Sequence, residues 1–231
     1  MRANTPLLRF LVLIVAFLSI SATAQERISR RISVGAHAGM SFSKVQFNPS
    51  VPQSMLGGIV VGARVRYVEE KHFGLVGELN LIQRGWKEKF EGYDFQYQHR
   101  FTYINLPVMT HIYFGSDRVK GFFNAGPEIS FMIGDAVSAN FDYANAFTLE
   151  GFPSTVHSTD QYTTPIKKRF EYGICAGAGL EVNVHHRHSV VLEGRFTYGL
   201  QDVFSNHNTD PFSGSSSIGI DVVIGYYFSL R

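Results

Sequence analysis

Eight segments of the chain alternate apolar residues with small or polar residues at a period of two. In the last of them, "SSIGIDVVIGYYFSLR" (216–231), one face is apolar from Ile218 to Phe228, and the opposite face carries glycine, serine and Asp221. Alternation of this kind predicts a β-strand with two unlike faces. The seven similar segments cover residues 32–42, 57–67, 72–82, 102–114, 121–131, 170–184 and 190–200. Strands of roughly ten residues match the length that a tilted strand needs to cross a bilayer.

The connections between these segments alternate between short and long. The short links lie at 69–71, 115–120 and 185–188, and the long ones at about 43–54, 84–100, 133–168 and 201–215. Loops of the longer kind are uncommon in a compact soluble domain. A membrane barrel has this rhythm, because its periplasmic turns are short, its extracellular loops are long, and an even strand number returns both chain ends to the periplasm.

Two closed architectures fit this pattern: a soluble calyx with its apolar face inside, and a membrane barrel with that face toward lipid. The polar face is rich in glycine and carries few lysines, whereas surface strands of soluble proteins carry Lys, Glu and Thr repeatedly. We therefore predict an all-β fold, an eight-stranded antiparallel up-and-down transmembrane β-barrel surrounded by outer-membrane lipid. A soluble periplasmic calyx-type ligand binder is the alternative.

An export signal precedes the predicted barrel. Two arginines lead into an apolar run at 10–20, and Ala22 and Ala24 stand in the A-x-A arrangement of a cleavage site. The run is too short to span a bilayer as a helix. We expect a signal peptide at 1–24, cleaved after Ala24, and an outer-membrane β-barrel domain at 25–231.

The charge of the chain argues against a nucleic-acid partner, and its cysteine content excludes an intramolecular disulfide. The formal net charge is only +2, and no basic stretch favours a nucleic-acid partner. Cys175 is the only cysteine, so an intramolecular disulfide is excluded and stability rests on the fold itself.

Nine charged residues fall, by parity, on the face that points into the predicted barrel. The interior of an eight-stranded barrel is just wide enough for side chains, and buried charges are costly unless they are paired. We hypothesise a structural ion-pair network that fills the lumen and prevents a wide pore, with Arg195 as the partner of Asp221. The nine residues are Arg64, Arg66, Glu78, Glu128, Glu171, Glu181, Glu193, Arg195 and Asp221.

Aromatic residues gather at both ends of the segments and predict two belts at the bilayer interfaces. Those near the short turns are Tyr67, Phe73, Tyr113, Phe114, Phe122, Phe123, Tyr226 and Phe228. Those near the long loops are Phe42, Trp86, Phe101, Tyr103, Phe131, Phe170, Tyr172 and Tyr198. Pro107 and Pro127 lie inside predicted strands, where a missing N–H breaks the ladder, and so predict bulges, a local kink or an earlier strand boundary.

Candidates for catalysis lie only in the long loops. A lipid-modifying hydrolase would need a nucleophile, a base and an orienting acid, for which His157, Ser158, Asp160, His207 and Asp210 are available. None of them shows the spacing that this chemistry demands. We expect no enzyme activity, and an outer-membrane lipid-modifying enzyme is the alternative.

The turn "HHRH" offers His185, His186 and His188 as metal ligands. Successive residues at a strand end face opposite ways, however, and no acid or cysteine completes a site. We expect no metal site and no cofactor.

The loop at 133–168 mixes aromatic and polar residues. Loops on rigid scaffolds often carry binding, and amphipathic aromatic side chains suit contact surfaces. The same side chains could instead pack on one another and cap the barrel. We expect a structural or interaction protein with an unidentified protein partner at its extracellular loops. The aromatic residues are Phe141, Tyr143, Phe147, Phe152 and Tyr162.

Five segments together resemble a known family. They are "ISVGAHAGMSFS", "YINLPVM", "FEYGICAGAGLEV", "VVLEGRFTYGLQDV" and "GIDVVIGYYF". The chain resembles the PorT-like outer-membrane β-barrel proteins of the Bacteroidetes type, which are related in architecture to OmpA/OmpX-style barrels. The resemblance implies this fold and the outer membrane of a Gram-negative cell, and a secretion-associated role through the name-giving member. It also implies that the outer-membrane assembly machinery recognises the last strand near Phe228.

Overall fold

The computed structural model describes residues 31–70, 72–153, 159–164, 166, 168–204 and 213–230. The predicted signal peptide with its cleavage site at Ala24 lies outside the described residues, as do His157, Ser158, His207 and Asp210.

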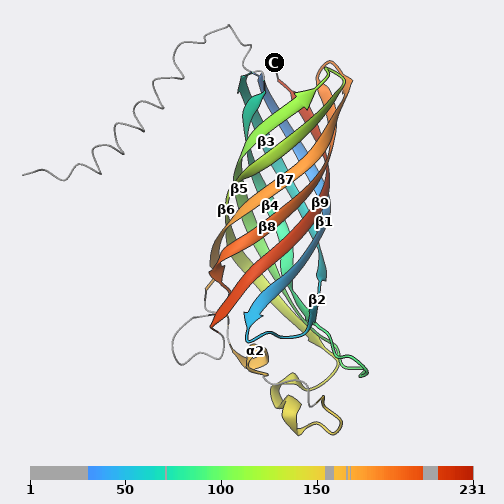
Figure 1. Ribbon diagram of the computed structural model, residues 1–231, viewed down its shortest axis with the longest axis vertical. Helices are drawn as coiled ribbons and strands as arrows, with labels where there is room; N and C mark the ends of the chain where they lie inside the picture. The colour runs from blue at the N-terminus through green and yellow to red at the C-terminus, as the bar shows by residue number, and fades with distance from the viewer. Residues whose placement is uncertain are drawn as a thin grey trace, which may run out of the picture.

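Eight long antiparallel strands of the described chain close a barrel (Figure 1). Each pairs with the next long strand in sequence, and β9 returns to pair with β1, while the two-residue β2 (Gln53–Ser54) adds to β4. The predicted eight-stranded up-and-down barrel is therefore confirmed. The long strands are β1 (Arg31–Asn48), β3 (Leu56–Glu70), β4 (Phe73–Glu88), β5 (Tyr97–Gly115), β6 (Val119–Ala139), β7 (Phe170–His185), β8 (His188–Asp202) and β9 (Gly214–Ser229).

The two faces of each strand meet different surroundings, as β9 illustrates. Ile220, Val222 and Ile224 point outward and are 41%, 47% and 61% exposed. Asp221 and Val223 between them are 3% and 2% exposed. A calyx would show the reverse, with its apolar face inside. The outward apolar band is the surface that lipid covers, and the soluble-calyx alternative is wrong.

β1, β4, β5 and β6 extend farther than predicted on the side of the long loops, because the ladder continues there after the outer face changes from apolar to polar. The eight long strands run for 15 to 21 residues. On β1 the outward residues beyond Phe42 are Lys44 and Gln46, and on β4 Lys87 follows the last outward leucine, Leu81. Much of the predicted loops at 43–54 and 84–100 is therefore strand that stands above the bilayer.

The end of the barrel opposite the C-terminus carries the folded loops (Figure 1). Between β6 and β7 the chain forms a 3-10 helix, η1 (Tyr143–Thr148), and a one-turn helix, α2 (Asp160–Thr163). Among the described residues, no helix combines the length and apolar character needed to cross a membrane.

Neither proline introduces a bulge. Pro107 lies opposite Glu128, and Pro127 opposite Ile174, in registers that continue unchanged on both sides. The prediction of bulges is wrong, because a missing N–H removes a hydrogen bond without requiring an extra residue in the strand. The register shift between β5 and β6 falls instead between Thr102 and Tyr103.

Candidate functional site

The interior of the barrel holds the charged residues that parity assigned to it. The structure places all nine on the inner face, with exposed fractions of 9% or less. Eight of them, together with Arg84, form three levels of ion pairs along the barrel axis, and each level joins strands that are not all neighbours in the sheet.

The middle level is a quartet of Arg64 on β3, Glu78 on β4, and Glu193 and Arg195 on β8. The Arg195 guanidinium donates to both Glu78 carboxylate oxygens at 2.8 and 2.9 Å, and to Glu193 Oε1 at 3.0 Å. Arg64 lies 3.3 Å from each of the same two carboxylates. Two guanidinium groups thus face two carboxylates, so the central quartet is balanced in charge and spans the lumen from β4 to β8.

The other two levels lie on the periplasmic and extracellular sides of the central quartet. Toward the periplasm, Arg66 binds both carboxylate oxygens of Glu181. Toward the extracellular side, Arg84 donates to Glu128 at 2.8 Å and lies 3.8 Å from Asp221. Paired in this way, the buried charges retain partners in place of water.

Two details of the predicted network are corrected. The register does set Arg195 opposite Asp221, but the Arg195 guanidinium reaches across the lumen to Glu78, and Asp221 pairs with Arg84. Glu171 forms no ion pair among the described residues and accepts a hydrogen bond from Ser217.

Arg84 was missed because the third predicted strand ended at residue 82. The signal was present in the sequence, since Arg84 has the same parity as Glu78 and Asn80.

Glycines on the inner face make room for these side chains. A Cβ added to Gly62 would lie 2.0 Å from Asn80 Oδ1, and one added to Gly177 would lie 2.9 Å from Glu193 Oε1. Both distances are shorter than a carbon–oxygen contact allows. The small residues of the polar face are thus a packing requirement of the filled lumen.

An aromatic cluster fills the barrel on the extracellular side of the charged levels, and we call it the aromatic cap. Its centre is Trp86, fully buried, with ring centroids of Phe47 and Phe101 at 5.3 and 5.6 Å. Its large buried members are Val45, Phe47, Trp86, Tyr97, Phe101, Tyr103, Tyr162 and Phe204. These members come from three strands, β1, β4 and β5, from the β6–β7 loop and from the residues just after β8.

The cap corrects the predicted extracellular belt. Trp86, Phe101 and Tyr103 point inward and are at most 3% exposed, so they do not lie at the lipid interface. On the extracellular side of the bilayer, the outer face of the strands meets water, and the interior of the barrel is the apolar side. At the other end, Phe122 is likewise buried inside the barrel, while Tyr226 remains 45% exposed on the outer face.

A buried carboxyl group fastens the β6–β7 loop to the cap. Glu88, at the extracellular end of β4, accepts hydrogen bonds from Tyr162 and from Gln161 Nε2, the latter at 2.9 Å. Burial raises the pKa of Glu88 above its ordinary value. Burial and the nearby Glu88 carboxyl likewise raise the pKa of Tyr162. The contact therefore places α2 directly on the barrel mouth.

The outer surface of the loops presents further aromatic side chains. Phe95 contacts Phe141 and Phe152, with ring centroids 5.2 and 5.6 Å apart, which joins the β4–β5 loop to the β6–β7 loop. Phe147 and Tyr93 remain 61% and 46% exposed. The two loops thus form one folded surface that is partly apolar.

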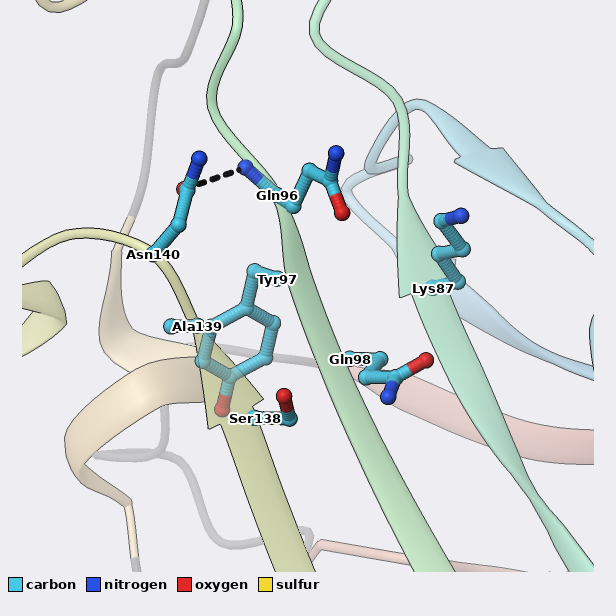
Figure 2. A pocket seen from close by; sticks show the side chains of 7 residues that line it. All are labelled: Lys87, Gln96, Tyr97, Gln98, Ser138, Ala139 and Asn140. Carbon is cyan, nitrogen blue, oxygen red and sulfur yellow. Dashed lines mark hydrogen bonds between the residues drawn. The ribbon is translucent and has the colours of Figure 1, made fainter.

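Figure 2 shows a small pocket beside this surface, between the extracellular ends of β4, β5 and β6. Its lining is mostly polar and includes Lys87, Gln98 and Ser138, and Asn140 Oδ1 accepts a hydrogen bond from the Gln96 N–H at 2.8 Å (Figure 2). With a volume of about 140 Å³, it is smaller than typical small-molecule sites.

The remaining candidates do not form a site in the described part of the chain. The rings of His185 and His188 are 6.3 Å apart, and no cluster of three or more His, Cys, Asp or Glu suited to a metal occurs among the described residues. Of the catalytic candidates only Asp160 is described, in α2. Cys175 is buried in the barrel wall.

A closed β-barrel with a lipid-facing apolar band and a filled polar lumen defines an integral outer-membrane β-barrel protein. The chain belongs to the outer membrane protein beta-barrel domain family, which matches residues 23–205. No curated protein matches the chain.

Several solved structures are similar to this barrel. The outer membrane protein OprG from Pseudomonas aeruginosa is 8% identical, with 87% of this chain and 96% of that chain covered and a TM-score of 0.52. Neisserial surface protein A is 11% identical, with coverage of 86% and 98% and a TM-score of 0.43. Ail of Yersinia pestis, in complex with the heparin analogue sucrose octasulfate, is 12% identical, with coverage of 87% and 100% and a TM-score of 0.41. At these identities the likeness shows the fold alone.

Proposed function

We propose that this protein is a non-enzymatic outer-membrane scaffold whose folded extracellular loops recognise a partner. The observation that carries the proposal is the exposure of Tyr93 and Phe147 on loops that are otherwise packed into the aromatic cap. Aromatic side chains held on ordered loops of a rigid barrel suit a contact surface. As the PorT-like resemblance implies, the partner belongs to a secretion-associated assembly.

The filled lumen supports a role that does not depend on transport. A continuous channel would require breaking the central quartet, the Arg66–Glu181 pair and the Arg84–Glu128 pair, and removing the aromatic cap. A barrel built in this way serves as a support for its loops.

The alternative is a lipid-modifying enzyme. Nothing in the geometry of the described residues favours this alternative. The purified protein is expected neither to acylate nor to deacylate lipopolysaccharide. An activity that disappears in His207→Ala would favour the enzyme instead.

The proposal is tested by in-cell crosslinking followed by affinity purification of the barrel. The variant Tyr93→Ser/Phe147→Ser is expected to lose the crosslinked partner that the wild type retains. The control Lys89→Ser/Glu91→Ser changes two residues of the β4–β5 loop, which also carries Tyr93. The side chains of these two residues are 57% and 77% exposed, and the control is expected to keep the partner. An unchanged set of partners in the aromatic variant would mean that the loops only cap the barrel.

A further inference from the structure

The periplasmic mouth of the barrel differs from the capped extracellular mouth in both shape and charge. A pocket of about 620 Å³ opens there, within the size range of small-molecule sites. We call it the basic mouth pocket, because five basic side chains line it against two carboxylates. The basic residues are Arg31, Arg66, Arg118, Lys120 and Arg187, and the acidic ones are Asp117 and Glu181.

The inner end of the basic mouth pocket is already neutralised. Arg66 holds Glu181 through both carboxylate oxygens, and its guanidinium carbon lies 4.2 Å from the centroid of the Tyr227 ring. Both partners are buried, at 7% and 3% exposure. The Glu181 carboxylate is therefore paired with Arg66, although the register also sets Lys120 opposite Glu181 on the neighbouring strand.

The rim carries the unbalanced charge. Within the part of the chain that the structure describes, Arg31, Arg118, Lys120 and Arg187 form no ion pair within 4.0 Å. Lys120 instead places its ammonium 5.2 Å from the centroid of the Tyr113 ring. Glu181 is paired with Arg66, so four cations of the lining face one remaining carboxylate, Asp117, and this excess of positive charge favours an anionic ligand.

Main-chain hydrogen bonds fix the two turns that carry the rim arginines. The Asn183 N–H donates to the Arg118 carbonyl at 2.9 Å, which ties the β5–β6 turn to β7. The Ser229 N–H donates to the Arg187 carbonyl at 2.8 Å, which ties the β7–β8 turn to β9. The guanidinium groups thus extend from anchored backbone, and less order has to be gained on binding.

The basic mouth pocket adjoins the surface that faces lipid. His188 lines the pocket, and its ring lies 5.8 Å from that of Tyr226 and 5.3 Å from that of Phe228, both on the outer face of β9. Val184, which also lines the pocket, is 67% exposed. Aromatic side chains of this kind mark the headgroup level of a bilayer. An anion in the pocket would therefore sit at the height of the phosphates of the periplasmic leaflet.

We propose that the basic mouth pocket binds the phosphate of an anionic phospholipid from the periplasmic leaflet. Arg118 and Arg187 suit this role, because a guanidinium presents paired donors that match phosphate oxygens. Lys120 adds a point charge, and the apolar edge at Val184 accommodates the start of the acyl chains. A free phosphate shares this chemistry, so the experiment separates the two sources.

The test uses the full mature barrel, folded in a neutral maltoside detergent and examined by native mass spectrometry. Dioleoyl phosphatidylglycerol is the lipid probe, and inorganic phosphate and dioleoyl phosphatidylcholine are the comparison ligands. The wild type is expected to retain phosphatidylglycerol in preference to both. The variant Arg118→Gln/Arg187→Gln is expected to bind it at least about a hundredfold more weakly, because each of the two lost charge-assisted contacts contributes roughly tenfold or more.

A matched control removes the same charge from the other mouth. Lys168→Gln/Arg169→Gln changes two residues just before β7 at the extracellular end and is expected to bind phosphatidylglycerol as the wild type does. Heat-modifiable gel mobility verifies that all three proteins are folded. Equal weakening in both variants, or no preference for phosphatidylglycerol, would overturn the proposal. Binding of inorganic phosphate with no retained lipid would assign the site to a soluble phosphate and overturn the lipid assignment.

Discussion

Replacing Arg195 with methionine tests the ion-pair network at its centre. Arg195 donates to both oxygens of Glu78 and to Glu193, at distances of 2.8 to 3.0 Å. In Arg195→Met the two carboxylates keep Arg64, 3.3 Å from each, as their one shared arginine, together with hydrogen bonds from Asn80 to Glu78 and from Asn124 to Glu193. Methionine keeps much of the length of the side chain, so the charge is lost with little change in packing.

The magnitude follows from burial. Glu78 and Glu193 are 6% and 0% exposed, so water cannot replace the lost guanidinium. Removing one partner of a buried ion pair costs about 3–5 kcal/mol, because the other charge is left uncompensated. The double variant Arg195→Met/Glu78→Met leaves Arg64 with Glu193, one charge of each sign. It is expected to recover roughly 2 kcal/mol of the free energy of unfolding relative to Arg195→Met.

The assay is urea-induced unfolding of the barrel in phospholipid vesicles. The mobility of unboiled samples on gels reports the whole barrel, and the fluorescence of Trp86, the single tryptophan, reports the cap. The control Arg169→Met removes an exposed arginine just before β7 and should leave the transition unchanged. The reasoning is refuted if Arg195→Met unfolds at the wild-type urea concentration, or if the double variant is less stable than Arg195→Met.

Three further predictions concern the cap, the glycines and the pore. Because burial raises the pKa of Glu88, its contribution to cap stability is complete below the ordinary glutamate pKa and is lost as the pH rises through the raised value. A pH titration of Trp86 fluorescence should show this loss in the wild type and not in Glu88→Gln. Gly177→Val should lower the free energy of unfolding by about 1–3 kcal/mol, whereas Gly77→Val, where an added Cβ meets open space, should have little effect; equal urea midpoints would contradict this. Planar bilayers containing the protein should show no steady conductance, and reproducible conductance steps would disprove the filled lumen.

Parity along the strands explains why so much of the barrel was predictable. In a pleated strand successive side chains face opposite ways, so one lipid-facing residue such as Ile220 assigns its neighbour Asp221 to the lumen. The same rule places Arg64 and Glu78 inside, where the structure has them. No knowledge of partners is needed for this step, because lipid imposes an apolar outer face on every strand.

Strand ends were less predictable, because the rule depends on lipid. Beyond the bilayer, Lys44 and Lys87 face outward and the apolar outer band ends, so the alternation no longer stands out as a strand. Trp86 and Phe101 then appear as members of a lipid belt although their parity is that of the lumen. Aromatic composition and parity disagreed at these positions, and parity was right.

Partners within the lumen lie beyond what one sequence shows. Register relates residues on adjacent strands, such as Arg195 and Asp221. The Arg195–Glu78 pair joins β8 to β4, which are not neighbours in the barrel. Such a pair depends on how far the side chain extends across the lumen and on glycines that leave room for it. The spacing of residues along one strand does not show which residues meet across the lumen.

The change of surroundings along β1 explains why the two mouths are built differently. At bilayer height the outward residues of β1 are apolar and its inward residues include His37 and Ser41. Beyond Phe42, Val45 and Phe47 are buried inside, and Lys44 and Gln46 face water. The upper barrel is thus folded like a soluble protein, with an apolar interior, above a membrane segment of the opposite polarity. The periplasmic mouth has no such strand extension, because the turns there are short. Its basic interior consequently opens at headgroup height, where an anionic lipid can supply the missing negative charge.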